Sequence, residues 1–352
     1  MEDIKSVKKE RIEAFEFVRA ISALGIISFH FSCHSNSTFK PLFYYQNGNY
    51  GIVFVTVFFM ISGAMLYYNY ENGINLKSFY YKRWKSIYPM FYIAFLWYYF
   101  EKVFENSSWF YNGNPKSLLL TVLGMDGYFS YRVNDYFLVG EWFVGAIVIT
   151  YILFPLMLKI FNKSDSLMTV IVIALYLIMQ WMYHMGWLRI QYHQNICVCM
   201  LSFELGMVAI KYKKALDNKI TFIVALACAM VIIGIKLSFL SESIAGHLLG
   251  IALFILFYFI GNKVMHIGII KKIVMVFSGL SYPIFLIQHQ VILKVLAFRN
   301  PVSVLYSVAV FVFILVLILV EAKILELVTS AVLNSKLYLG LENIGNNHLE
   351  KN

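Results

Sequence analysis

A succession of apolar runs, each about 20 residues long, dominates the sequence. A run of this length predicts a helix that spans a bilayer, because a helix satisfies its own backbone hydrogen bonds in hydrocarbon. Of the 352 residues, 60% are hydrophobic and only 14% are charged, which is too apolar for a soluble domain. The runs cover residues 13–34, 50–70, 84–104, 140–161, 167–187, 192–212, 219–240, 243–262, 272–297 and 302–330. We therefore expect an all-α, polytopic membrane helix bundle of about ten transmembrane helices.

Lysine and arginine residues gather in alternate connections between these runs. The cation-rich segments lie around residues 5–11, 77–85, 159–163, 211–219 and 263–272. Because cations are enriched in cytoplasmic loops, this alternation predicts that both termini are cytoplasmic and that the number of spans is even. The net charge of +10 is thereby explained by membrane topology rather than by nucleic-acid binding.

Outside the apolar runs, the sequence indicates no separate soluble domain. Residues 105–140 form the longest outer connection, and its short apolar piece at 118–125 predicts an interfacial or re-entrant helix. The four cysteines lie in apolar stretches, as small buried residues would, so we predict neither a disulfide nor a metal site. We expect one membrane domain over residues 1–338 and a polar C-terminal tail over 339–352.

The first predicted span carries two ionisable side chains, Arg19 and His30. Eleven steps of 100° are three turns plus about 20°, so both side chains share one helix face, about 16 Å apart along the axis. His34 continues this face one turn further on. Ionisable groups inside a span are costly and are therefore functional candidates. The alternative is that Arg19 extends to the membrane surface and His30 is a hydrogen-bonded packing residue.

The predicted orientation places the other polar candidates towards the cytoplasmic or the outer side of the membrane. Arg83 and Lys85 begin the third span on the cytoplasmic side, the side of Arg19. Towards the outer side we place His30, His289, Glu141 and Trp142. This polarity suits a reaction in which an anionic donor arrives from the cytoplasm and a reactive group is passed to an acceptor outside.

Five short motifs follow one another along nearly the whole chain. They are Arg19 and His30 in the first span; Phe58, Phe59, Ser62 and Gly63 in the second; Arg83, Ile87 and Pro89 at the third; Trp142 and Phe143 in the fourth; and Ser281, Tyr282, Leu286 and His289 in the ninth. With these motifs in this order, the chain resembles acyltransferase family 3. The members of this family are integral-membrane O-acyltransferases that modify sugars on bacterial surface polysaccharides, antibiotics and lipids.

The chain departs from the family pattern at two positions. Ser86 stands where the family has a second arginine, and Lys85 beside it restores the charge but not a bidentate fork. Glu141 stands where many relatives have histidine.

The resemblance implies transfer of an acyl group, usually acetyl from acetyl-CoA, to a sugar hydroxyl. Such a hydroxyl needs a general base, and imidazole is suited to that role near neutral pH. We expect His30 to be this base, or a transient acyl carrier if donor and acceptor sites lie on opposite sides of the membrane. Arg19, Arg83 and Lys85 would hold the CoA phosphates, unless they serve only membrane topology.

The remaining candidates each have two interpretations. His289 is either a second acid or base that acts with or orients His30, or a packing histidine. Glu141 would bind sugar hydroxyls or pair with His30, and Trp142 would stack on a sugar ring; otherwise both belong to the membrane interface. Ser62 either contacts the acceptor or, with Gly63, only permits close helix packing.

We therefore expect a multi-pass O-acyltransferase of the bacterial cytoplasmic membrane. Its expected partners are acyl-CoA, a polysaccharide or lipid-linked sugar acceptor and membrane lipids, with no nucleic acid and no metal. The alternative function is a membrane exporter or flippase of a polysaccharide intermediate. The absence of an internal repeat and the scarcity of intramembrane cations argue against it.

Overall fold

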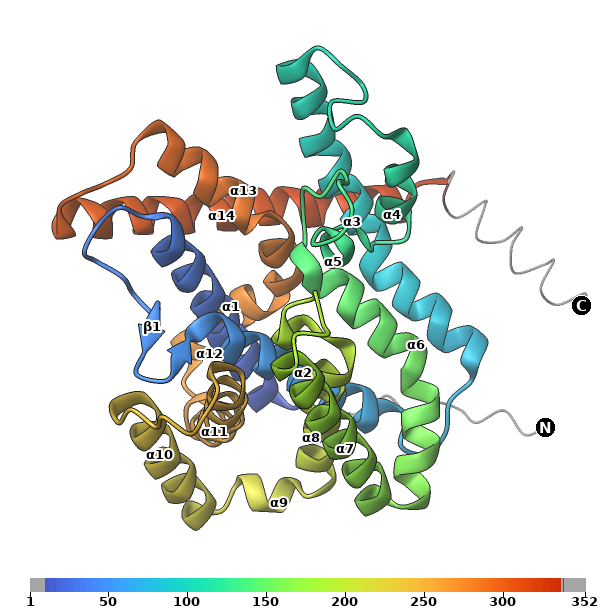
Figure 1. Ribbon diagram of the computed structural model, residues 1–352, viewed down its shortest axis with the longest axis vertical. Helices are drawn as coiled ribbons and strands as arrows, with labels where there is room; N and C mark the ends of the chain where they lie inside the picture. Colours follow the sequence, from blue (N-terminus) through green and yellow to red (C-terminus); the bar gives the residue numbers. More distant parts are fainter. Residues whose placement is uncertain (1–9, 337, 339–352) are drawn as a thin grey trace, which may run out of the picture. The chain divides into compact units, whose positions relative to one another are not determined.

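The computed structural model describes residues 10–336 and 338, except for the side chain of Glu141, and it is predominantly helical (Figure 1). The elements are α1 (Glu13–His34), β1 (Tyr44–Tyr45), β2 (Gly48–Asn49), α2 (Tyr50–Tyr70), α3 (Leu76–Asn106), η1 (Pro115–Ser117), α4 (Leu118–Val122), α5 (Asp126–Phe129), α6 (Glu141–Lys163), α7 (Asp165–His184), η2 (Tyr192–Gln194), α8 (Ile196–Lys211), α9 (Lys213–Leu216), α10 (Lys219–Gly234), α11 (Glu242–Val264), α12 (Gly268–Gly279), α13 (Ser281–Phe298) and α14 (Val304–Leu333). The only sheet in the described part is the antiparallel β1–β2 hairpin. The all-α membrane fold class is confirmed.

Seven of the described helices are long and apolar enough to cross a membrane: α1, α2, α6, α7, α11, α13 and α14. Helices α8 and α10 have only 16 residues each, and α3 begins with a strongly basic segment. The expected count of ten spans and the cytoplasmic location of both termini stay predictions. The polar tail over residues 339–352 lies outside the described residues.

The expected ninth span over 272–297 is wrong in one respect, because the structure divides it into α12 and α13. Helix α12 ends at Gly279, and Pro283 follows four residues later. Proline has no N–H for the carbonyl of residue i−4, and its ring collides with that carbonyl. A continuous helix through Gly279 is therefore disfavoured, and α13 begins anew at Ser281.

The chain forms two compact units, which we describe separately. The first comprises the chain up to Phe29, Pro41–Ile74 and Leu153–Gly279. Its most extensive helix pair is α2 with α8, which approach through Gly63 and Gly206. A Cβ atom on Gly63 would lie 1.8 Å from the Phe203 carbonyl oxygen, and one on Gly206 would lie 1.9 Å from that of Met60. The two backbones are therefore in contact, as small residues permit between membrane helices.

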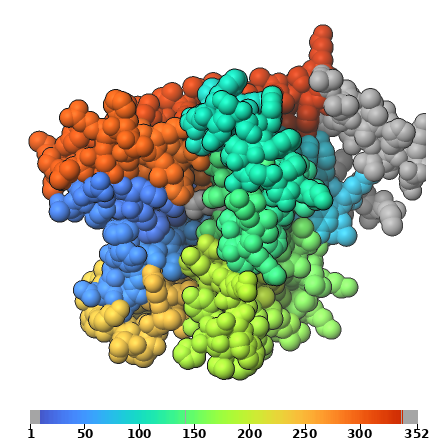
Figure 2. Space-filling model, turned by 45° about the horizontal axis from the view of Figure 1, so that its top comes forward, coloured from blue at the N-terminus to red at the C-terminus, as the bar shows by residue number. Residues whose placement is uncertain are grey.

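The second unit comprises His30–Lys40, Asn75–Ile152 and the chain from Leu280 onward. Here α13 packs against α14 and α3. The connection between α3 and α6 folds back on α3: the hydroxyls of Tyr88 and Tyr92 donate to the carbonyls of Leu123 (2.8 Å) and Val122 (2.6 Å). Figure 2 shows this connection, in teal and green, at the surface of the molecule.

Candidate active site

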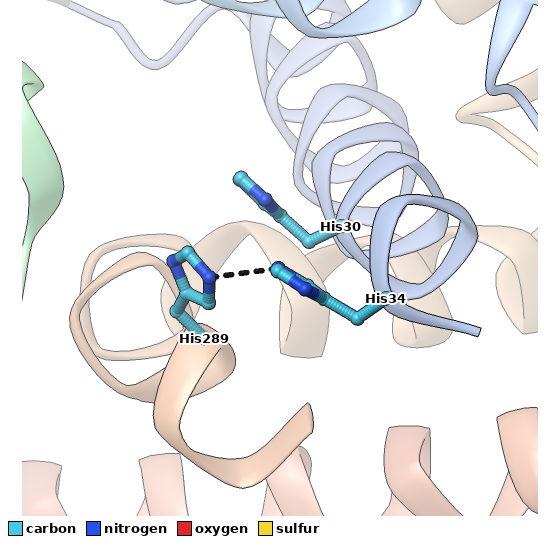
Figure 3. Close-up of side chains that lie close together, drawn as sticks. All are labelled: His30, His34 and His289. Atoms are coloured by element: carbon cyan, nitrogen blue, oxygen red, sulfur yellow. Dashed lines mark hydrogen bonds between the residues drawn. The ribbon is translucent and has the colours of Figure 1, made fainter. Parts of the chain in front are cut away.

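Three histidines meet in the second unit (Figure 3). His30 and His34 lie one turn apart on α1, so their side chains share one face of that helix, and His289 comes from α13. The His30 and His289 rings are stacked with centroids 4.9 Å apart, and the His34 and His289 centroids are 5.0 Å apart. The Nε2 atoms of His34 and His289 lie 2.9 Å apart and share a hydrogen bond. One ligand atom from each of the three rings lies within 4.8 Å of those of the others.

The C-terminal end of α1 is fixed by two polar side chains. Asn300 donates from Nδ2 to the His34 carbonyl oxygen (2.9 Å), and its Oδ1 accepts from the backbone N–H of Asn36 (2.7 Å). Lys40 Nζ donates to the carbonyl oxygens of Ser32 and Ser35. The last carbonyls of a helix have no partner within it and carry partial negative charge, so these donors stabilise the turn that bears His34.

Helix α13, which carries His289, contacts the segments that bear two of the other motifs. The Tyr282 hydroxyl donates to the Ile87 carbonyl oxygen in α3 (3.0 Å). The Phe143 ring at the start of α6 contacts Phe285, with centroids 4.9 Å apart. Gln290 Nε2 donates to the Leu138 carbonyl oxygen (2.7 Å). The motif segments of the third, fourth and ninth expected spans thus meet around α13.

Two of the three cations expected at the donor site, Arg83 and Lys85, lie on α3. The Arg83 guanidinium lies over the rings of Phe79 (6.0 Å) and Tyr151 (5.7 Å). Its Nε is shielded from solvent and has no hydrogen-bond partner among the described residues. Lys85 Nζ lies over the rings of Tyr81 (5.8 Å) and Tyr338 (5.4 Å). The Arg83 guanidinium is thus held over two aromatic rings, with a buried Nε that has no acceptor in the described part of the chain.

Arg19 lies in the first unit within an ionic cluster. Its Nη1 is 3.3 Å from Glu16 Oε2, Arg11 Nε donates to Glu16 Oε1 (2.8 Å), and Ser278 donates to Oε2. Glu16 is 3% exposed, whereas the Arg19 side chain is 27% exposed. Arg19 thus neutralises a buried carboxylate and still presents part of its guanidinium to solvent.

The three candidates for acceptor binding, Ser62, Glu141 and Trp142, lie on α2 and at the start of α6. Ser62 lies on α2 in the first unit, next to the glycine that contacts α8. Trp142 is partly buried at the start of α6, with its ring 6.4 Å from that of Phe143. Helix α6 begins at Glu141, whose side chain lies outside the described residues.

Two carboxyl groups within apolar helices form hydrogen bonds to neighbouring helices. Glu204, in the first unit, accepts a hydrogen bond from Thr169 Oγ1 (2.6 Å). Glu321, in the second unit, accepts one from the Tyr98 hydroxyl. Both bonds join neighbouring helices, so these carboxyl groups have a packing role within their units.

The sequence did not single out several polar groups that the structure buries. Gln288, beside His289 in the chain, is 0% exposed, and neither its Nε2 nor its Oε1 has a partner among the described residues. Asp126 and Asp135, in the connection after α3, are 2% and 7% exposed. One oxygen of each accepts a backbone N–H, from Gly127 or Phe137, while Oδ2 of each has no partner in the described part of the chain. Their position in a polar connection gave no sign of this burial.

Burial raises the pKa of the Asp126 carboxyl to about 6. The hydrogen bond from Gly127 opposes this rise, and the negative charge of the nearby Asp135 adds to it. In the unfolded chain the pKa is about 3.9, so the unfolded state loses this proton at lower pH than the folded state. The free energy of unfolding should therefore fall between about pH 4 and pH 6, by up to about 3 kcal/mol. We expect Asp126→Asn to reduce this fall in thermal unfolding of the purified protein.

The matched control for this prediction is Glu105→Gln, because the Glu105 side chain is 49% exposed. It should leave the pH dependence of unfolding as in the unmodified protein. An Asp126→Asn variant with an unaltered pH dependence would contradict the prediction.

Comparison with known proteins identifies one family. The model of the acyltransferase domain of family 3 matches residues 12–321, which include all five motif segments. No curated protein and no solved structure matches the chain.

Proposed function

Because the chain belongs to acyltransferase family 3, we propose that this multi-pass membrane acyltransferase moves an acetyl group from acetyl-CoA to a sugar hydroxyl. The acceptor is a cell-surface polysaccharide or its lipid-linked precursor, and the enzyme resides in the bacterial cytoplasmic membrane. The observation that carries the proposal is the meeting of His30, from the first motif, with His289, from the last. Two motif histidines more than 250 residues apart in the sequence come together only in the fold.

His30 serves as the general base in this proposal. Its imidazole accepts the proton of the sugar hydroxyl while the sugar oxygen attacks the thioester carbonyl carbon. The carbon–sulfur bond then breaks, and the CoA thiolate leaves and takes the proton from His30. The products are an O-acetyl sugar and CoA. If donor and acceptor bind on opposite sides of the membrane, His30 instead carries the acetyl group between them.

His289 positions the base. It stacks on His30 and shares a hydrogen bond with His34, whose backbone is held by Asn300. Because the neutral imidazole has one donor and one acceptor nitrogen, the bond to His34 fixes the orientation of the His289 ring. A fixed His289 ring in turn restricts the rotation of His30, and such restriction favours catalysis.

Arg83 is the best-supported donor-binding cation. Its guanidinium would supply charge-assisted hydrogen bonds for a CoA phosphate, and the two rings beneath it hold the guanidinium in place. Lys85, also placed over aromatic rings, adds a second positive charge on the same segment. Arg19 is the third donor-binding candidate from the sequence, and in the first unit its guanidinium is paired with Glu16.

Two measurements test this function. Purified protein in lipid nanodiscs should hydrolyse acetyl-CoA slowly without an acceptor and release CoA faster when the acceptor saccharide is added. Cells without the gene should make polysaccharide of normal length that lacks O-acetyl groups, and a gene copy should restore them. Loss of the whole polymer, with its precursor retained inside, would instead support the exporter.

A further inference from the structure

The three clustered histidines also have the arrangement of a metal site. His30 and His34 are four residues apart on α1, the spacing at which two imidazoles on one helix face bind the same ion. His289 of α13 supplies a third nitrogen from a second helix. Three histidines that leave a fourth position open form the ligand set of a catalytic-type zinc site. We propose that His30, His34 and His289 bind one divalent transition-metal ion of the zinc type.

The geometry is close to what coordination requires. Three nitrogens at about 2.0 Å from a tetrahedral ion lie about 3.3 Å from one another. The His34 and His289 Nε2 atoms are 2.9 Å apart, and all three ligand atoms lie within 4.8 Å of one another. The three nitrogens are therefore close enough for one ion, which the side chains would bind after rotating so that the lone pairs of the stacked His30 and His289 rings converge. The backbone of the turn that carries His34 is already held by Asn300.

The ligand chemistry selects the ion. Three imidazoles suit Zn²⁺, Co²⁺, Ni²⁺ and Cu²⁺, whereas Mg²⁺ and Ca²⁺ need oxygen ligands. Imidazole binds metals in its neutral form, so affinity should fall as the pH is lowered.

Metal binding and base catalysis compete for the same nitrogen. An imidazole nitrogen that coordinates the ion has no lone pair for the proton of a sugar hydroxyl. Added zinc should therefore slow acyl transfer, and a chelator should reverse the effect. This regulatory consequence rests on the proposed function, but metal binding itself does not, and it is measured without acceptor or donor.

The experiment uses the full-length protein, purified in detergent and stripped with a chelator. Zn²⁺ is titrated against a chromophoric chelator, and Co²⁺ is followed by the visible absorption of its tetrahedral complexes. We expect one ion per chain and a higher thermal unfolding temperature with Zn²⁺. Loss of an outer partner of a metal ligand costs about 10- to 100-fold in affinity, so His34→Gln or His289→Gln should weaken binding at least about 100-fold.

Further variants separate coordination from folding. His34→Cys should retain binding and add a thiolate band to the Co²⁺ spectrum, which only a true ligand position can do. Cys33→Ser and His266→Gln should bind as the unmodified chain does, because Cys33 and His266 are exposed and outside the cluster. The proposal is overturned if the unmodified protein binds no stoichiometric ion, or if binding survives in both His34→Gln and His289→Gln.

Discussion

Replacing His30 with glutamine is expected to lower the turnover of acyl transfer by about 10²- to 10⁴-fold, the usual contribution of a positioned general base. Glutamine keeps a polar side chain that can form hydrogen bonds, but it cannot accept the proton of a sugar hydroxyl near neutral pH. The loss should appear in kcat, while the KM for acetyl-CoA changes little, because the donor is held by Arg83 and its neighbours in our proposal. Release of CoA in nanodiscs with saturating acceptor measures both constants.

Two companion variants make this result interpretable. His289→Gln should reduce kcat less than His30→Gln, because it disturbs the position of the base and leaves the base itself. His266→Gln, at an exposed site, should have no effect. All variants should elute as the same species in size-exclusion chromatography. Near-normal turnover in folded His30→Gln would remove His30 from the reaction and favour a transport function for the cluster.

Replacing Gly63 with alanine is expected to prevent accumulation of folded protein or to destabilise it by about 3 kcal/mol, the upper end of the usual cost of overpacking. The added Cβ would lie 1.8 Å from the Phe203 carbonyl oxygen, and the atom it meets is backbone, so no side chain can rotate away. Helices α2 and α8 must then separate along their length. Gly206→Ala, which brings a Cβ to 1.9 Å from the Met60 carbonyl oxygen, should have the same effect.

Gly234 of α10 provides the matched control in the same unit. A Cβ there meets no atom within 4 Å, so Gly234→Ala should express and unfold as the unmodified protein does. Fluorescence-detected size exclusion of the three variants after a heat step compares them directly. If Gly63→Ala is as stable as Gly234→Ala, the close approach of α2 and α8 does not limit stability.

Much of the fold can be predicted from local sequence because a membrane span needs only a long apolar run. Helices α1, α2, α6, α11 and α14 begin and end within a few residues of the predicted ranges. The break between α12 and α13 was missed, although Pro283 carried the signal, because hydropathy alone does not register a lost backbone hydrogen bond. The predicted role of Gly63 in close helix packing is confirmed, because a Cβ atom there would collide with the backbone of Phe203.

The functional site could be predicted only in part. Motif order identified His30 and His289 as candidates, and helical periodicity placed His34 on the same face as His30. Sequence alone set no distance between α1 and α13, so neither the His34–His289 hydrogen bond nor the three-histidine geometry could be foreseen. The sequence-based expectation of no metal site came from the cysteines, whereas our zinc proposal rests on a histidine cluster that only the fold assembles.

The sequence by itself determined the membrane class, the helical fold and the acyltransferase family, because these depend on apolar length, charge pattern and motif order along the chain. Only the tertiary structure decided which ionisable groups meet and which are shielded from water. Burial gives Asp126 its raised pKa, Glu16 holds Arg19, and α13 carries His289 to the end of α1. Proximity and burial arise from contacts between segments far apart in the chain, and no local pattern specifies them.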